Sequence, residues 1–275
     1  MLATEKLDIN ELIRICHDAG KAILEVYEKE FDVQTKADSS PLTQADLRSH
    51  TIITARLREL YPEVPVLSEE SADDSPYEVR QHWKQCWLVD PLDGTKEFIK
   101  RNGQFTINIA LIQGSKPVAG IVYAPALDLL YYGDEEDGAF KVTGGQASRL
   151  PVSTARQSNA LVIVGSLSHS TPELEAFVAE QRRKHGNVEF IGMGSALKIC
   201  LVAEGKADLY PRLGPTMEWD SAAAHAVANA AGRKVFQFGT EEELVYNKPN
   251  LLNPSFLVQV DPARSIDKDR GCVGS

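Results

Sequence analysis

The chain has 275 residues, of which 43% are hydrophobic and 25% are charged, a balance typical of a globular protein with a large core. This balance argues against a disordered chain, and the formal net charge of -10 argues against nucleic-acid polymers as partners, because these need basic patches. No segment is apolar enough to predict a membrane span, and the four cysteines lack the spacing of zinc or redox motifs. We therefore expect a cytoplasmic protein of one large domain or two closely packed ones.

Two amphipathic helices are predicted at the start of the chain. Apolar residues recur at steps of three and four between Leu7 and Tyr27. Thr43 begins a second helix, which Tyr61-Pro62 ends. Because Thr43-x-x-Asp46 matches a capping box, a structural role for Asp46 is an alternative to a catalytic one.

Short apolar runs separated by turn residues predict strands from about Val64 onward. The runs are VPVL, WLV, FTINIALI, VAGIVYAP, LLYYG and AFKV, and the segments GSKP and DEEDG are typical of hairpin connections. In FTINIALI, the side chains of Phe105, Ile107, Ile109 and Leu111 are expected to share one face. The pattern predicts an antiparallel meander.

Strands and helices alternate beyond Leu150. The strands are ALVIV, VEFIG and ADLYP, and the helices run from Pro172 to about His185, over SALKICLVAEG, and from Asp220 over DSAAAHAVANAAG. We expect an α+β half in residues 1–150 and an α/β half in residues 151–275, with the functional site where the halves meet.

The segment DPLDGT, residues 90–95, is the strongest indication of chemistry. A buried strand ends in Asp90, Pro91 stops it, and Asp93 precedes a Gly-Thr turn. Such a turn can direct both carboxylates and the Leu92 carbonyl at one point, which offers Mg²⁺ three hard oxygen ligands. For an isolated motif of this kind, a plain strand-to-turn junction with solvated acids is the more common interpretation.

Two further acids lie at predicted element ends. Glu69 follows a strand and Asp220 begins a helix, although a turn acid and a first-turn partner of the helix dipole would explain them too. Histidine and cysteine are missing from all three segments, which favours Mg²⁺ or Mn²⁺ over zinc and suits phosphoryl chemistry. Thr95 and Asp46 are candidates for orienting an attacking water.

Two rival functions share parts of this pattern. Aspartyl-phosphate phosphatases also place D-G-T after a strand, but they use D-x-D near the start of the domain, whereas two residues separate Asp90 and Asp93 here. A catalytically silent metal- or nucleotide-binding protein on the same fold is the second rival. Acids at all four positions argue against it.

The motifs SEES at 68–71, DPLDGT at 90–95 and WDSAA at 219–223 resemble the inositol monophosphatase superfamily of magnesium-dependent, lithium-sensitive phosphomonoesterases. Within it, KADSSPLTQAD, WLVDPLDGTKEFIKRNGQFTINIALI and GSALKICLVAEGKADLYPRLGPT resemble the bacterial CysQ-type 3'(2'),5'-bisphosphate nucleotidases. The resemblance runs from the first helix to about Phe256 and leaves out the tail RSIDKDRGCVGS.

The resemblance implies a fold and a reaction. The fold would be a layered, alternating αβαβα sandwich of the sugar-phosphatase type. The reaction would convert adenosine 3',5'-bisphosphate and water into AMP and phosphate, and would act on its sulfated relative, in sulfate assimilation. An inositol monophosphatase or a broad sugar-phosphate phosphatase is the alternative, but Lys96-Glu97-Phe98 after DGT favours the nucleotide branch over the T-N-F of the inositol branch. Monomer or dimer stays open, as does peripheral attachment to the cytoplasmic face of the inner membrane.

The resemblance also implies roles for the acidic residues. Glu69, Asp90 and the Leu92 carbonyl would hold one Mg²⁺, and Asp90, Asp93 and Asp220 a second. Glu70 is a candidate for a third ion or for an outer partner of the site, so the ions number two or three. Asp46 and Thr95 would activate water.

Substrate contacts follow from the same resemblance. They fall on the metal-binding segments and on the second half of the chain, at Glu69, Leu92, Asp93, Gly94, Thr95, Ser168, His169, Gly194, Lys198 and Asp220. His169 as an ordinary loop residue and Lys198 as a solvated helix lysine are the alternatives.

Overall fold

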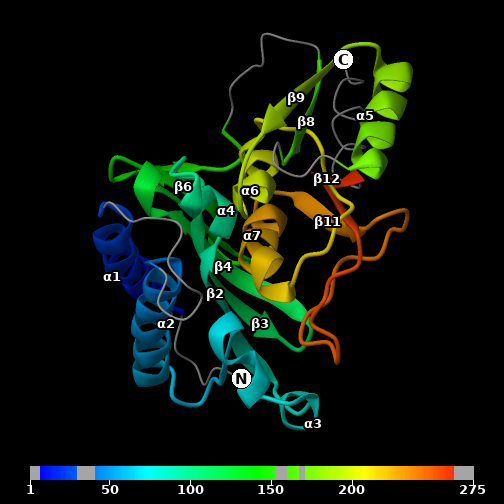
Figure 1. Ribbon diagram of the computed structural model, residues 1–275. Coiled ribbons are helices and arrows are strands. Elements are labelled where there is room, and N and C mark those ends of the chain that lie inside the picture. The colour runs from blue at the N-terminus through cyan, green and yellow to red at the C-terminus, as the bar shows by residue number, and fades with distance from the viewer. Residues whose placement is uncertain (1–6, 30–40, 153–159, 167–170, 263–275) are drawn as a thin grey trace, which may run out of the picture.

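The computed structural model describes residues 7–29, 41–152, 160–166 and 171–262. Its central element is a seven-stranded sheet in the order β1-β2-β3-β4-β5-β6-β7 (Figure 1). The strands are β1 (Val66–Ser68), β2 (Gln85–Asp93), β3 (Thr106–Gln113), β4 (Lys116–Ala124), β5 (Leu129–Asp134), β6 (Gly138–Thr143) and β7 (Gln146–Arg149). From β2 onward each strand pairs antiparallel with the next, which confirms the predicted meander and both hairpins.

Two strands depart from the predicted pattern. β1 pairs parallel with β2 and so lies outside the meander. The prediction missed β7, because all four of its side chains are exposed and it shows no apolar alternation.

The helices α1 (Ile9–Tyr27) and α2 (Pro41–Leu60) cover one face of this sheet (Figure 1). Asp8 caps α1, since its side chain accepts from the Asn10 N–H at 2.9 Å. Phe105, which directly precedes β3, and the alternating β3 residues Ile107, Ile109 and Leu111 all belong to the core beneath these helices, as predicted. The capping box at Thr43 was wrong, because α2 already includes Pro41 and Thr43 lies inside its first turn.

The helices α6 (Leu197–Glu204) and α7 (Glu218–Ala230) lie on the opposite face of the sheet. α7 begins two residues earlier than predicted. It approaches β4 so closely that a Cβ on Gly120 would lie 2.1 Å from the carbonyl oxygen of Ala223. One core cluster therefore joins the two halves of the chain, and a division near Leu150 stays a prediction.

The second half of the chain adds the outer layers. β8 (Leu161–Gly165) and β9 (Val188–Gly192) pair parallel, and β12 (Phe256–Val260) lies antiparallel between β10 (Tyr210–Arg212) and β11 (Arg233–Gln237). α5 (Pro172–His185) packs outside them. The αβαβα layering and the alternation up to α7 are confirmed. β11 and β12 were missed, since only Val235 of β11 is buried and β12 follows a long irregular segment.

Short helices complete the described ranges. They are the 3-10 helices η1 (Glu69–Asp74) and η2 (Pro125–Leu127) and the α-helices α3 (Tyr77–Arg80) and α4 (Thr95–Ile99). None of the helices in the described ranges combines the length and apolar character that crossing a membrane requires.

The contact between β4 and α7 can be tested with Gly120→Ala. The added methyl group forces α7 away from the sheet, and we expect urea denaturation to show a loss of about 1–3 kcal/mol in the free energy of unfolding. The control is Gly214→Ala, since a Cβ there meets no atom within 4 Å, and it should stay within about 0.5 kcal/mol of the wild type. Equal denaturation midpoints for the two variants would contradict the close contact.

Candidate active site

Three aspartates converge where β2 meets the start of α7. Asp90, Asp93 and Asp220 each offer one carboxylate oxygen, and these atoms lie within 4.8 Å of one another. The structure thus brings together acids that are far apart in the sequence. Their assignment as metal ligands stays a prediction at this point.

A bulge in β2 directs the first two aspartates. Asp90 is paired with Asn108 and Asp93 with Thr106, so β2 carries one extra residue. The prediction that Pro91 stops the strand was wrong, because β2 continues through the bulge, where a residue without an N–H is tolerated. The Leu92 N–H donates to Asp90 Oδ1 at 3.0 Å, which holds that carboxylate in place.

The third aspartate lies in the first turn of α7. Asp220 Oδ2 accepts from the Met217 N–H at 2.8 Å. Asp220 is therefore a first-turn acid of α7, as the structural alternative expected. The bond from the Met217 N–H holds its side chain beside Asp93.

Glu69 and Asp46 complete the group of acids. Glu69 begins η1 directly after β1, and β1 is parallel to β2, so it lies next to Asp90. Asp46 comes from α2 and lies beside Glu69 and Glu70. Its Oδ1 atom is buried without a hydrogen-bond partner among the described residues. The four segments predicted to carry the site thus meet.

Burial and mutual repulsion disfavour negative charge on these groups. They raise the pKa of Glu69 and of Asp220 to about 7 and that of Asp46 to about 8, and they hold the pKa of Asp90 well above its usual range. A divalent cation would reverse this effect. Carboxylate oxygens without sulfur or imidazole are the donors that Mg²⁺ prefers, so the residues fit that ion.

Asp93 also connects the two halves of the chain. Its Oδ2 atom accepts from the Ala196 N–H at 2.7 Å and from Thr106 Oγ1 at 3.5 Å. The next residue, Gly94, has φ of 98° and is the N-cap of α4. Thr95, which is exposed, is the first residue of this helix. The expected helix start after DPLDG is confirmed.

A cavity of about 240 Å³ opens beside Asp93, Thr95 and Asp220, and Lys198 and Arg212 also line it. Lys198 is buried, its Nζ atom donates to the Ser195 carbonyl at 2.6 Å, and burial lowers its pKa to about 8. The alternative of a solvated lysine was therefore wrong. Acidic and cationic side chains therefore line the same cavity.

Sequence reasoning missed three polar residues of this cavity. Ser195 Oγ, Arg212 Nε and Thr216 Oγ1 are buried without hydrogen-bond partners among the described residues. Their segment, GSALKIC through PRLGPT, was recognised as characteristic, but only Gly194 and Lys198 were selected from it.

Gly194 is not among the residues that line this cavity. The Gly194 N–H donates to Gln104 Oε1 at 2.8 Å, and a Cβ on Gly194 would lie 2.5 Å from Glu97 Cγ. Gly194 thus allows close packing, while Ser195 beside it lines the cavity. Ser168 and His169 lie outside the described residues.

Comparisons with known proteins place the chain in one family. The model of the inositol monophosphatase family matches residues 7–266. The chain is 47% identical over 254 residues to the 3'(2'),5'-bisphosphate nucleotidase CysQ of Escherichia coli K12, covering 92% of this chain and 99% of that protein. It is 37% identical over 263 residues to the Haemophilus influenzae protein of the same description, covering 95% and 96%.

Solved structures show the same fold. CysQ from Bacteroides thetaiotaomicron superimposes with a TM-score of 0.84 at 48% identity, covering 92% of this chain and 97% of that one. Inositol monophosphatase II from Staphylococcus aureus, at 23% identity and a TM-score of 0.69 with 94% and 91% coverage, supports the fold alone.

The raised pKa values predict how pH affects stability. The folded protein keeps protons that the unfolded chain releases near pH 4, so without divalent ions the free energy of unfolding should fall as pH rises from about 4 to about 8. The fall should exceed the roughly 1.4 kcal/mol that corresponds to a shift of one pKa unit in a single group. Urea denaturation in a chelator, at intervals of pH, measures it.

Asp220→Asn serves as the comparison for this experiment. It removes one repelling charge, so its stability should depend less on pH, and added Mg²⁺ should stabilise the wild type more at pH 8 than at pH 5. A stability difference between variant and wild type that does not change with pH would contradict the electrostatic account.

Proposed function

The chain belongs to the inositol monophosphatase family, and from this we propose that it is a magnesium-dependent 3'(2'),5'-bisphosphate nucleotidase. It hydrolyses the 3'-phosphate of adenosine 3',5'-bisphosphate to give AMP and phosphate, and its sulfated relative is a second substrate. In sulfate assimilation this removes a by-product of sulfate activation. The observation that carries the proposal is the cavity lined both by Asp93 and Asp220 and by Lys198 and Arg212.

The acids supply the sites for the metal. Glu69, Asp90 and the Leu92 carbonyl would hold one Mg²⁺, and Asp90, Asp93 and Asp220 would hold another, with Glu70 as a candidate for a third. Bound there, Mg²⁺ polarises the phosphoryl group, lowers the pKa of water and neutralises the departing oxygen. The cluster of three aspartate oxygens within 4.8 Å supports shared ions.

Asp46 and Thr95 orient the attacking water. Thr95 is exposed at the cavity and Asp46 Oδ1 has no protein donor among the described residues, so both can hydrogen-bond to it. The water oxygen forms a bond to phosphorus as the bond to the ribose 3'-oxygen breaks. The water gives up one proton and the ribose oxygen takes up one, so the products are the 3'-hydroxyl and phosphate. No aspartyl phosphate is required, and the family match overturns the aspartyl-phosphatase alternative.

The second anionic group of the substrate meets the other side of the cavity. Lys198 and Arg212 offer positive charge there, and Ser195 Oγ and Arg212 Nε are buried polar atoms that a ligand can satisfy. The N–H groups of Gly94 and Thr95 at the start of α4 suit the phosphate under attack. Contacts from Ser168, His169 and Gly194 belong to the same proposal.

Finer properties follow from the family resemblance alone. We propose two or three Mg²⁺ ions during turnover, inhibition by lithium at concentrations where sodium has no effect, and a cytoplasmic location. Either a monomer or a dimer is compatible with a cavity whose described lining comes from one chain.

A phosphate-release assay tests the proposed substrate. With Mg²⁺, turnover should be fastest on adenosine 3',5'-bisphosphate and slower on inositol monophosphate and fructose 1,6-bisphosphate, because only the first pairs a target phosphate with a nucleotide group that fills the cavity. Asp93→Asn is the control and should abolish turnover of all three, since an amide cannot replace a carboxylate among metal ligands. Faster release from inositol monophosphate would assign the chain to the other branch.

Thr95→Ala tests the orienting role of the hydroxyl. We expect kcat to fall by about 100-fold or more while the Mg²⁺ concentration needed for half activity changes little, because the hydroxyl acts on water. Thr51→Ala is the matched control, since this exposed threonine donates to Leu47 within α2 and should keep normal kcat. A larger effect on the Mg²⁺ requirement than on kcat would make Thr95 a binding residue instead.

A further inference from the structure

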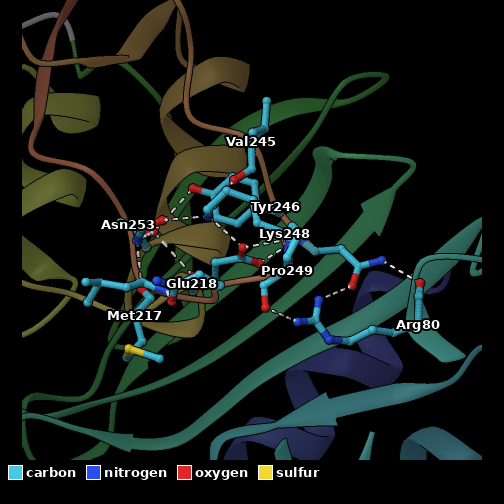
Figure 2. Close-up of polar contacts among 12 residues, drawn as sticks. Arg80, Met217, Glu218, Val245, Tyr246, Lys248, Pro249 and Asn253 are labelled. Atoms are coloured by element: carbon cyan, nitrogen blue, oxygen red, sulfur yellow. Dashed lines mark hydrogen bonds and ion pairs between the residues drawn. The ribbon is translucent and has the colours of Figure 1, made fainter. Parts of the chain in front are cut away.

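A fully buried carboxylate lies two positions before Asp220. Glu218 is the first residue of α7 and is 0% exposed. Its polar contacts are drawn in Figure 2. It accepts from the Asn247 N–H at 2.5 Å, the Lys248 N–H at 3.0 Å and Lys248 Nζ at 2.6 Å. A buried charge is tolerated only when it is paired and hydrogen-bonded in this way.

The loop that supplies these donors, residues 245–253, also holds the backbone around Asp220. The Leu251 carbonyl accepts from the Glu218 N–H at 2.9 Å. Asn253 Nδ2 donates to the Met217 carbonyl at 2.8 Å and to Ser221 Oγ at 2.9 Å. Met217 is the residue whose N–H donates to Asp220, so the loop fixes the turn on both sides of that aspartate.

Arg80 attaches the other side of the loop to the first half of the chain. It is buried and donates to Asn247 Oδ1 and to the Pro249 carbonyl, each at 2.9 Å (Figure 2). Asn247 Nδ2 donates back to the Arg80 carbonyl at 2.8 Å. Arg80 ends α3, and α3 follows η1, which carries Glu69 and Glu70. The network therefore connects the segment of Glu69 with the segment of Asp220.

We propose that Glu218 is a positioning residue for divalent-cation binding, acting with Lys248 and Arg80. The ion pair of Glu218 and Lys248 fixes the first turn of α7. Asp220 therefore stays close to Asp90 and Asp93, although the three carboxylates repel one another. A buried ion pair adds little net stability compared with apolar side chains, but it specifies one geometry through directed hydrogen bonds. The inference rests on the proposed function in one respect, which is that Asp220 binds the cation.

Mn²⁺ binding without substrate tests the inference. Electron paramagnetic resonance of the free ion gives the dissociation constant of Mn²⁺ for the whole chain, with no turnover involved. For Glu218→Gln we expect this constant to rise by roughly tenfold or more, the scale seen when outer partners of metal ligands are removed.

The matched control is Glu204→Gln. Glu204 is also a buried carboxylate paired with lysines, at 2.8 Å from Lys141 Nζ and 3.0 Å from Lys206 Nζ. It is the last residue of α6, whereas Lys198, which lines the cavity, is in the first turn of that helix. Both variants should lower the thermal midpoint. Only Glu218→Gln should weaken Mn²⁺ binding.

Two changes at Lys248 guard against a variant that fails to fold. Lys248→Met leaves Glu218 its two backbone donors and should weaken Mn²⁺ binding less than Glu218→Gln does. Lys248→Arg keeps the ion pair, and its dissociation constant for Mn²⁺ should equal that of the wild type. Binding is measured well below each thermal midpoint, so that folded protein is compared.

The outcomes separate this inference from the proposed function. If Asp93→Asn loses Mn²⁺ binding while Glu218→Gln binds as tightly as Glu204→Gln, the positioning role is overturned and the metal centre stands. If the wild type binds no Mn²⁺, or Asp93→Asn binds it normally, both are overturned.

Discussion

Repulsion among carboxylates gathered in a partly buried junction is the constraint on which this structure depends. Asp90, Asp93 and Asp220 place oxygens within 4.8 Å of one another, and Glu69 and Asp46 lie beside them. Such a group opposes folding unless protons or a cation neutralise it. The backbone therefore holds each aspartate through a donor of its own, namely the N–H groups of Leu92, Ala196 and Met217. Because the side chains cannot turn away, their shared position favours a divalent ion.

The same constraint explains how the halves of the chain meet. Asp93 belongs to the sheet of the first half but accepts from the Ala196 N–H of the second, so the wall that carries Lys198 is fixed relative to the acids. α7 is held on the sheet by close contact at Gly120 and at its first turn by the loop bound to Glu218. The acids and the second half of the chain are therefore attached to one core.

The sequence predicted those parts of the site that local patterns determine. Alternation in β3, the proline start of α5 and the carboxylates at element ends are readable within a few residues, and all were found. What depends on distant contacts was missed. The bulge at Pro91 needs its partner strand, the burial of Lys198 needs the cavity around it, and the pairing of Glu218 with Lys248 joins segments 30 positions apart. The prediction was least complete for the cavity around Lys198, since Ser195 and Arg212 carry no sequence pattern that separates them from ordinary polar residues.

The charge distribution of the cavity also bears on which phosphate esters fit. With a net charge of -10, the chain as a whole does not attract anions, so positive charge must be supplied locally. Bound cations can supply it beside the aspartates, and within the cavity lining Arg212 supplies it at all ordinary pH values, as does Lys198 when it is protonated. A substrate with one phosphate would leave the wall's buried Arg212 Nε and Ser195 Oγ without partners, which costs binding energy. A molecule with two anionic groups can meet cations bound at the aspartates and also give these buried atoms partners, which favours a bisphosphate over a monophosphate of similar size.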